Sequence, residues 1–112
     1  MPNTQPSKTD VVASLAAAAD SVRQAYLAAQ AANPAADLSK LYKAEMAAEA
    51  IWSTAEEKAL KADPAVAKAK ADLDAATQDI RNNLGTLKDI AQWVQLLDGL
   101  VNLATSVGKF FV

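Results

Sequence analysis

The sequence predicts an all-α protein, a single-domain antiparallel four-helix bundle that is rich in alanine and has a strongly apolar C-terminal helix. Of its 112 residues, 27 are alanine, whereas only three are glycine and four are proline. This composition favours helix over strand. Apolar residues also recur at intervals of three and four, the period of one helix face. A chain of this length is sufficient for one domain with one buried core.

The first seven residues precede this helical pattern. They include two prolines and, apart from Met1, no large apolar side chain, so we expect residues 1–7 to form a disordered lead. Ser7 and Asp10 have the spacing of a helix capping box, which predicts a first helix over residues 8–32. Asn33-Pro34 ends this helix, because the residue before a proline avoids the α conformation.

A second helix is predicted over residues 38–62, where apolar positions again step by three and four. Either Asp37 or Ser39 can cap its start. The dipeptide Asp63-Pro64 marks the next boundary, with Asp63 as the cap and Pro64 at the first helical position, where its missing N–H costs nothing. A third helix is therefore predicted over residues 64–84.

The C-terminal segment from Thr86 onward is the most apolar part of the chain. It holds 13 large apolar residues in 27 positions, whereas the preceding 85 positions hold 18. We expect Gly85 to end the third helix in the left-handed conformation and Thr86 to cap a fourth helix over residues 87–111. Polar residues form only a narrow stripe on this helix, so the other three helices should cover it.

Short links between the helices predict that each one packs antiparallel to the next. The fourth helix would then lie beside the first and third. Its apolar surface is larger than two alanine-rich neighbours can cover. Either it lies centrally, with the other three helices around it, or part of it faces another molecule.

The chain has few of the residues that catalysis or metal binding usually requires. It contains no histidine and no cysteine, which excludes Ser-His and Cys-His pairs, imidazole zinc sites and thiolate sites. Glu45 and Glu49 share a helix face, but no partner acids are predicted opposite them. We therefore expect a non-enzymatic protein with no cofactor, no metal site and no small-molecule substrate.

The charge pattern limits the class of partner. The net charge is −2, and the 11 basic residues are dispersed among 13 acidic ones, so we expect no nucleic-acid binding. The expected function is a structural or protein–protein interaction module that binds an unknown protein or a second copy through the C-terminal helix. The candidate contact residues on this helix are Trp93, Leu96, Leu100, Leu103, Val107, Phe110 and Phe111. Trp93 can alternatively be a core anchor, and its helical spacing favours the core.

The alternative function is association with a membrane or lipid surface. The C-terminal helix is long enough to span a bilayer, but polar residues such as Gln95 and Asp98 interrupt it too often for a transmembrane segment. An interfacial helix usually carries several basic residues, and this one has only Lys88 and Lys109. Because residues 1–10 lack a signal-peptide pattern, cytoplasm is the expected location, with leaderless export as the open alternative.

Two glycines interrupt the fourth helix. Gly99 and Gly108 each lower its helix propensity, and an interior glycine usually has a packing reason. We therefore interpret them as notches that admit a bulky neighbour such as Trp52, with a hinge as the alternative.

Overall fold

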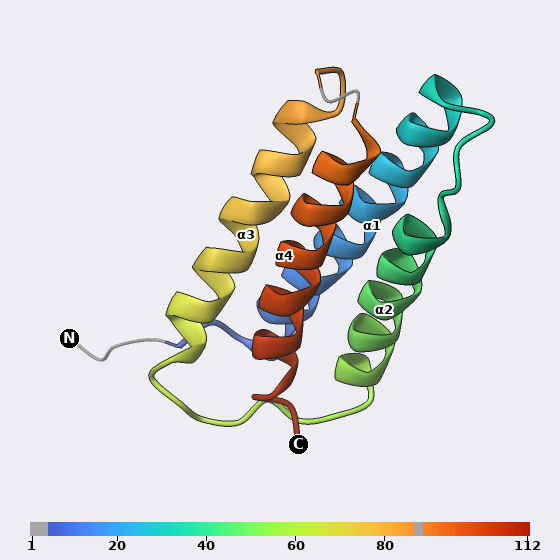
Figure 1. The fold of residues 1–112 in the computed structure, drawn as a ribbon. Helices are drawn as coiled ribbons and strands as arrows, with labels where there is room; N and C mark the ends of the chain where they lie inside the picture. The colour runs from blue at the N-terminus through green and yellow to red at the C-terminus, as the bar shows by residue number, and fades with distance from the viewer. Residues whose placement is uncertain (1–4, 87–88) are drawn as a thin grey trace.

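Four helices account for most of the chain in the computed structural model, which describes residues 5–86 and 89–112. They are α1 (Lys8–Ala32), α2 (Ser39–Glu56), α3 (Val66–Asn83) and α4 (Ile90–Gly108). The predicted all-α four-helix bundle is confirmed. Figure 1 shows that successive helices run in opposite directions, and that the α2–α3 link and the C-terminal tail meet at the same end of the bundle.

Helix α1 begins and ends where the sequence predicts. The Ser7 hydroxyl oxygen accepts a hydrogen bond of 3.1 Å from the backbone N–H of Asp10, as a capping residue does. At the other end, Asn33 donates its backbone N–H to the carbonyl of Ala29 and adopts a non-helical conformation. Pro34 prevents the helix from continuing.

Helix α2 begins one residue later than predicted, at Ser39, and ends earlier. Asp37 accepts a hydrogen bond of 3.0 Å from the backbone N–H of Ser39, and this bond from Ser39 lowers the pKa of the Asp37 carboxyl. The helix ends at Glu56, so residues 57–62 are not helical as expected. Their backbone groups pair with the C-terminal tail instead, which satisfies the N–H groups of Ala59 and Lys61 outside a helix.

Helix α3 starts two residues after the predicted position. Asp63 still caps the turn, since its carboxylate accepts a hydrogen bond of 2.9 Å from the backbone N–H of Ala65. The prediction of a left-handed Gly85 is wrong, because no residue in the described ranges has a positive φ. Instead, Leu84 follows the last residue of α3 with its backbone still in the right-handed α conformation.

Helix α4 is capped by a different residue from the one predicted. Asp89, rather than Thr86, accepts a hydrogen bond from the backbone N–H of Ala91, and the helix begins at Ile90. The hydroxyl of Thr86 donates to the carbonyl of Asn83 at 3.2 Å and so belongs to the preceding turn. The other predicted starting residues, 87–88, lie outside the described residues.

The order of the helices around the bundle also differs from the prediction. Helix α4 contacts α2 and α3 along its sides and α1 across the centre, whereas α2 and α3 make no contact with each other in the described ranges. The prediction that α4 lies beside α1 and α3 is therefore wrong for α1. The reason is the link 57–65, whose nine residues can span about 30 Å and carry the chain past α4 to the far side.

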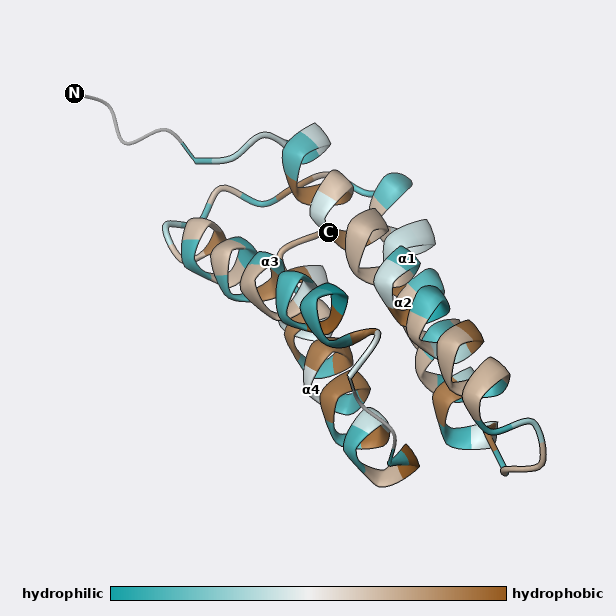
Figure 2. Ribbon diagram, turned by 90° about the horizontal axis from the view of Figure 1, so that it is seen from above, coloured by the Kyte–Doolittle hydropathy of each residue, from teal (hydrophilic) through white to brown (hydrophobic). Residues whose placement is uncertain are grey.

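Helices α1 and α4 share the centre of the core. Helix α1 has nine buried residues, most of them small, whereas four of the five buried residues of α4 are large. Figure 2 shows that hydrophobic residues are densest along α4. The small side chains of α1 let the two helices approach each other across the bundle. Of the two predicted alternatives, the contacts support a central position, because α4 touches all three other helices, but α1 does so as well.

Candidate functional site

The structure divides the seven predicted contact residues of the C-terminal segment into two groups. Trp93, Leu100, Val107 and Phe111 belong to the core, where none is more than 5% exposed. Trp93, Leu100 and Val107 have almost no surface left for a partner while the bundle stays folded, and Phe111 exposes only a small part of its surface. Leu96, Leu103 and Phe110 are partly buried and pack against this core. Leu96 and Leu103 are seven apart and so lie on one side of α4. Phe110 lies in the turn after the helix, next to Ala65 and Ala69 at the start of α3.

The C-terminal tail holds the base of the bundle together. Ala59 and Val112 exchange two backbone hydrogen bonds of 3.1 and 2.9 Å, and Lys61 donates its N–H to the carbonyl of Phe110 at 2.7 Å. These bonds flank an isolated antiparallel bridge between Leu60 and Phe111. A segment predicted as helix and a chain end therefore form a short ladder, which turns the Phe111 ring into the core.

The end of the N-terminal lead contacts the same ladder. The side-chain amide of Gln5 donates to the carbonyl of Lys61 at 3.0 Å and accepts from the backbone N–H of Asp63 at 2.8 Å. Within the lead predicted for residues 1–7, Gln5 and Ser7 thus have defined partners, while residues 1–4 lie outside the described ranges. No local pattern signals these bonds, because Gln5 and Lys61 are far apart in the sequence.

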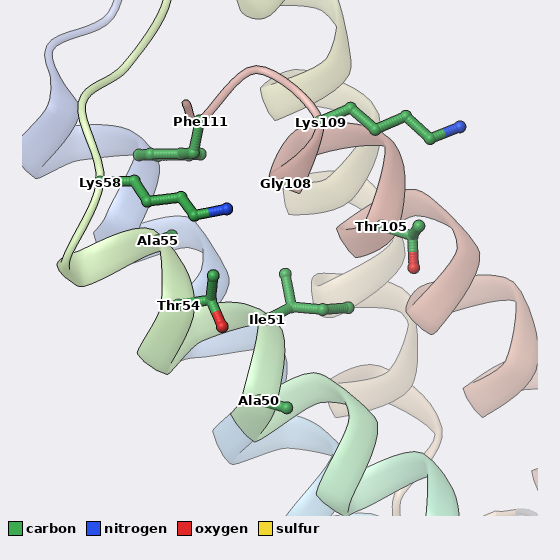
Figure 3. Close-up of a pocket in the computed structure, with 9 residues that line it drawn as sticks. All are labelled: Ala50, Ile51, Thr54, Ala55, Lys58, Thr105, Gly108, Lys109 and Phe111. Carbon is green, nitrogen blue, oxygen red and sulfur yellow. The ribbon is translucent and has the colours of Figure 1, made fainter.

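A groove of about 430 Å³ lies beside the ladder, between the C-terminal halves of α2 and α4 (Figure 3). Its apolar surface comes from alanine, isoleucine, glycine and phenylalanine, its hydroxyl groups from two threonines, and its charges from two lysines. The lining residues are Ala50, Ile51, Thr54, Ala55, Lys58, Thr105, Gly108, Lys109 and Phe111.

Gly108 sets the width of this groove at one point. A Cβ atom built on Gly108 would lie 3.1 Å from Cγ2 of Ile51, which is closer than ordinary van der Waals contact. The glycine therefore lets α4 approach α2. The predicted notch exists at Gly108, but its neighbour is Ile51 rather than Trp52. Gly99 is exposed, with open space around a built Cβ, so the notch interpretation is wrong there.

The groove is positively charged. Its lining residues include no acid, and in the described part of the chain the ion pairs join Lys68 with Asp72, Lys70 with Asp74 and Arg81 with Asp20. Lys58 and Lys109 take part in none of these pairs. The lining side chains thus offer apolar contact, hydroxyl groups and two ammonium groups, a combination that suits binding of an anion with an apolar part.

A second surface feature lies on the outer side of α2. Tyr42 and Met46 are about half exposed, at 49% and 54%, and their spacing of four places them on one face. The ring of Tyr42 lies against Tyr26 of α1, with the ring centroids 5.9 Å apart and the planes tilted by 52°. We call Tyr26, Tyr42 and Met46 the tyrosine patch. Sequence analysis did not single it out, because the surrounding pattern resembles the flank of a core face.

Comparison with known proteins does not assign a function. The chain matches no protein-family model, no curated protein and no solved structure at a significant level. Among residues 5–86 and 89–112, no group of three or more acidic side chains is placed to hold a metal ion. No described helix has both the length and the hydropathy needed to cross a bilayer.

Proposed function

We propose that this bundle is a non-enzymatic module that binds another protein through the tyrosine patch. The observation that carries the proposal is the half exposure of Tyr42 and Met46 on one face of α2. Tyrosine and methionine are both enriched at protein interfaces. Large apolar side chains that remain this exposed next to one another lose contact with water when a partner covers them.

The packing of Tyr42 supports this role. Its ring is held against Tyr26, so less side-chain freedom is lost when a partner binds. Both tyrosines also have hydroxyl groups, which can form hydrogen bonds at the rim of an interface. On the C-terminal segment, Leu96, Leu103 and Phe110 offer a second, smaller contact strip, because they are only partly buried.

Charge substitutions at the patch test the proposal. In pull-downs with the full chain, the double variant Tyr42→Glu/Met46→Glu should lose a partner that the wild-type chain retains. Leu27→Glu is the matched control, since Leu27 is a similarly exposed large residue on α1. The variant Leu96→Gln tests the strip on α4. If all the variants retain the same proteins as the wild-type chain, the proposal is wrong.

Self-association is the case in which the partner is a second copy. Light scattering over a range of concentrations should then show a dimer for the wild-type and Leu27→Glu chains. The double variant should be monomeric. A dimer that persists in the double variant would place the self-contact elsewhere.

Association with an anionic lipid surface is the second candidate function. Lys61, Lys68 and Lys109 line a shallow depression together with Phe110 and one acid, Asp72, which pairs with Lys68. The side chain of Val112, two residues after Phe110, is 69% exposed. Basic residues around exposed apolar groups favour anionic membranes. Co-sedimentation with phosphatidylglycerol vesicles, but not with phosphatidylcholine vesicles, is the expected result. Equal recovery with both, or with neither, would contradict it.

A further inference from the structure

We infer that the groove between α2 and α4 binds a free alkyl carboxylate, with the hydrocarbon chain against Ile51 and Phe111 and the carboxylate at Lys58 and Lys109. This inference does not rest on the tyrosine patch, whose α2 residues lie in the N-terminal half of the helix, whereas the groove lies at its C-terminal half. It assigns to the groove a ligand class that composition did not predict.

The shape of the groove favours a small ligand over a protein segment. Its volume of about 430 Å³ falls in the range of small-molecule sites. It extends along the last two turns of α2 and the following turn, from Ala50 to Lys58, and the C-terminal tail bounds it at one end. A partner helix would need a longer surface than this to bury a stable interface.

The floor of the groove suits a hydrocarbon chain. Ile51 lies between α2 and α4, and the ring of Phe111 is turned in from the tail (Figure 3). Ala50, Ala55 and Gly108 complete the apolar part of the lining. Binding a hydrocarbon chain here removes apolar surface of both the ligand and the groove from water.

The charges favour an anionic end group. Lys58 lies on the α2 side of the groove and Lys109 on the α4 side, so their ammonium groups can approach a ligand from two directions. In Figure 3 the Lys58 side chain reaches across the mouth, whereas Lys109 extends away from it. Exposed lysine side chains change rotamer on the picosecond-to-nanosecond timescale, so Lys109 is not fixed in this orientation.

The hydroxyl groups complete the polar edge. Thr105 donates its hydroxyl hydrogen to the carbonyl of Val101 at 2.8 Å. The hydroxyl of Thr54 is exposed and can donate to a carboxylate. The polar edge therefore offers two ammonium groups and one free hydroxyl, and it contains no acidic side chain that would repel a carboxylate.

Calorimetric titration of the full chain with dodecanoate, below its micelle concentration, tests the inference. The expected result is saturable binding with one ligand per chain. Dodecyltrimethylammonium has the same hydrocarbon chain and the opposite charge, and acetate has the charge without the chain, so each should bind at least tenfold more weakly. Equal binding of the cationic amphiphile would overturn the inference.

Three variants locate the site. Lys58→Glu/Lys109→Glu should weaken dodecanoate binding about tenfold, as expected for the loss of two exposed charge contacts and the introduction of repulsion. Ala50→Phe should also weaken it about tenfold by filling the groove from an exposed position. Arg23→Glu, which changes an exposed charge on α1, is the control and should alter binding less than twofold. Unchanged binding in the first two variants would overturn the inference.

A vesicle measurement separates the free carboxylate from a lipid surface. If the chain binds phosphatidylglycerol vesicles but shows no saturable dodecanoate binding, the inference is overturned and the lipid-surface function is favoured. The variant Tyr42→Glu/Met46→Glu should bind dodecanoate normally, so failure of the protein-binding proposal leaves this result unaffected.

Discussion

Gly99 and Gly108 occupy the same helix but have opposite surroundings. Gly99 lies in the interior of α4 on its exposed side, with no atom near a built Cβ. Gly108 is the last residue of the helix and lies against Ile51. The sequence presents both as interruptions of one helical pattern. Only the packing shows that one glycine weakens the helix without compensation and that the other allows a close approach.

Replacing each of these glycines by alanine should therefore change the free energy of unfolding by a different amount or with a different sign. Gly99→Ala should stabilise the protein by about 0.5–1 kcal/mol, because alanine is the better helix former and nothing opposes its methyl group. Gly108→Ala should gain less or destabilise, since Ile51 has to move by a few tenths of an ångström. Urea denaturation measures both. A larger gain at Gly108 than at Gly99 would contradict this account.

Thr77 is an exception to the apolar pattern of the core. It is buried on α3, and its hydroxyl oxygen has no hydrogen-bond partner. Burying such a group without a partner costs about 1–3 kcal/mol. Thr77→Val should thus raise the free energy of unfolding by about 1 kcal/mol.

Thr105→Val is the control for this substitution. Thr105 is exposed, so its replacement should change the free energy of unfolding by less than about 0.5 kcal/mol. If Thr77→Val destabilised the protein instead, the hydroxyl of Thr77 would have a favourable contact that the packing does not reveal.

At the scale of elements, helix α2 ends early because the residues after it pair with the C-terminal tail. Residues 57–62 have a composition that suits a helix, yet Ala59 and Lys61 pair with the tail. This exchange keeps the backbone groups satisfied and lets the ring of Phe111 enter the core between α2 and α4. Burial of a large aromatic ring outweighs the extra helical turns, since helix propensity contributes only a few tenths of a kcal/mol per residue.

Phe111 should consequently be the most important residue of the tail. Phe111→Ala should destabilise the protein by about 3 kcal/mol, because a buried phenylalanine is lost. Phe110 is only half buried, so Phe110→Ala should lower the free energy of unfolding by about 1–2 kcal/mol. Hydrogen exchange should accelerate at the amides of Ala59 and Lys61 in the Phe111 variant. Equal costs for the two variants would contradict the assigned role of the ladder.

At the scale of the whole molecule, the bundle is arranged around the α1–α4 contact. These two helices touch across the centre, while α2 and α3 stay apart on either side within the described ranges. Ala18 and Ala25 of α1 are completely buried. Their methyl groups allow the approach that larger side chains would prevent.

Enlarging one of these alanines should separate the two central helices. Ala18→Leu should lower the free energy of unfolding by about 1–3 kcal/mol, because the extra volume of leucine has no cavity to fill. Ala13→Leu is the control at an exposed position of the same helix and should change stability by less than about 0.5 kcal/mol. Thermal unfolding of both variants provides the comparison. A neutral Ala18→Leu would show that the centre is loosely packed.

The sequence by itself determined the features that depend on local chemistry. Alanine content and the three-four spacing are sufficient to predict four helices. The side chains of Ser7 and Asp63 bond near the helix ends as predicted, and Asn33-Pro34 ends the first helix. These signals are local because a helix is held by bonds between residues four apart.

Only the tertiary structure decided how the helices surround one another and which apolar residues stay exposed. The nine-residue link leaves several helix orders accessible, and the choice among them depends on how large α4 side chains fit small α1 side chains. The groove at Ile51 and the tyrosine patch both follow from that choice. They bring together residues from separate helices, and no interval within one helix encodes such a contact.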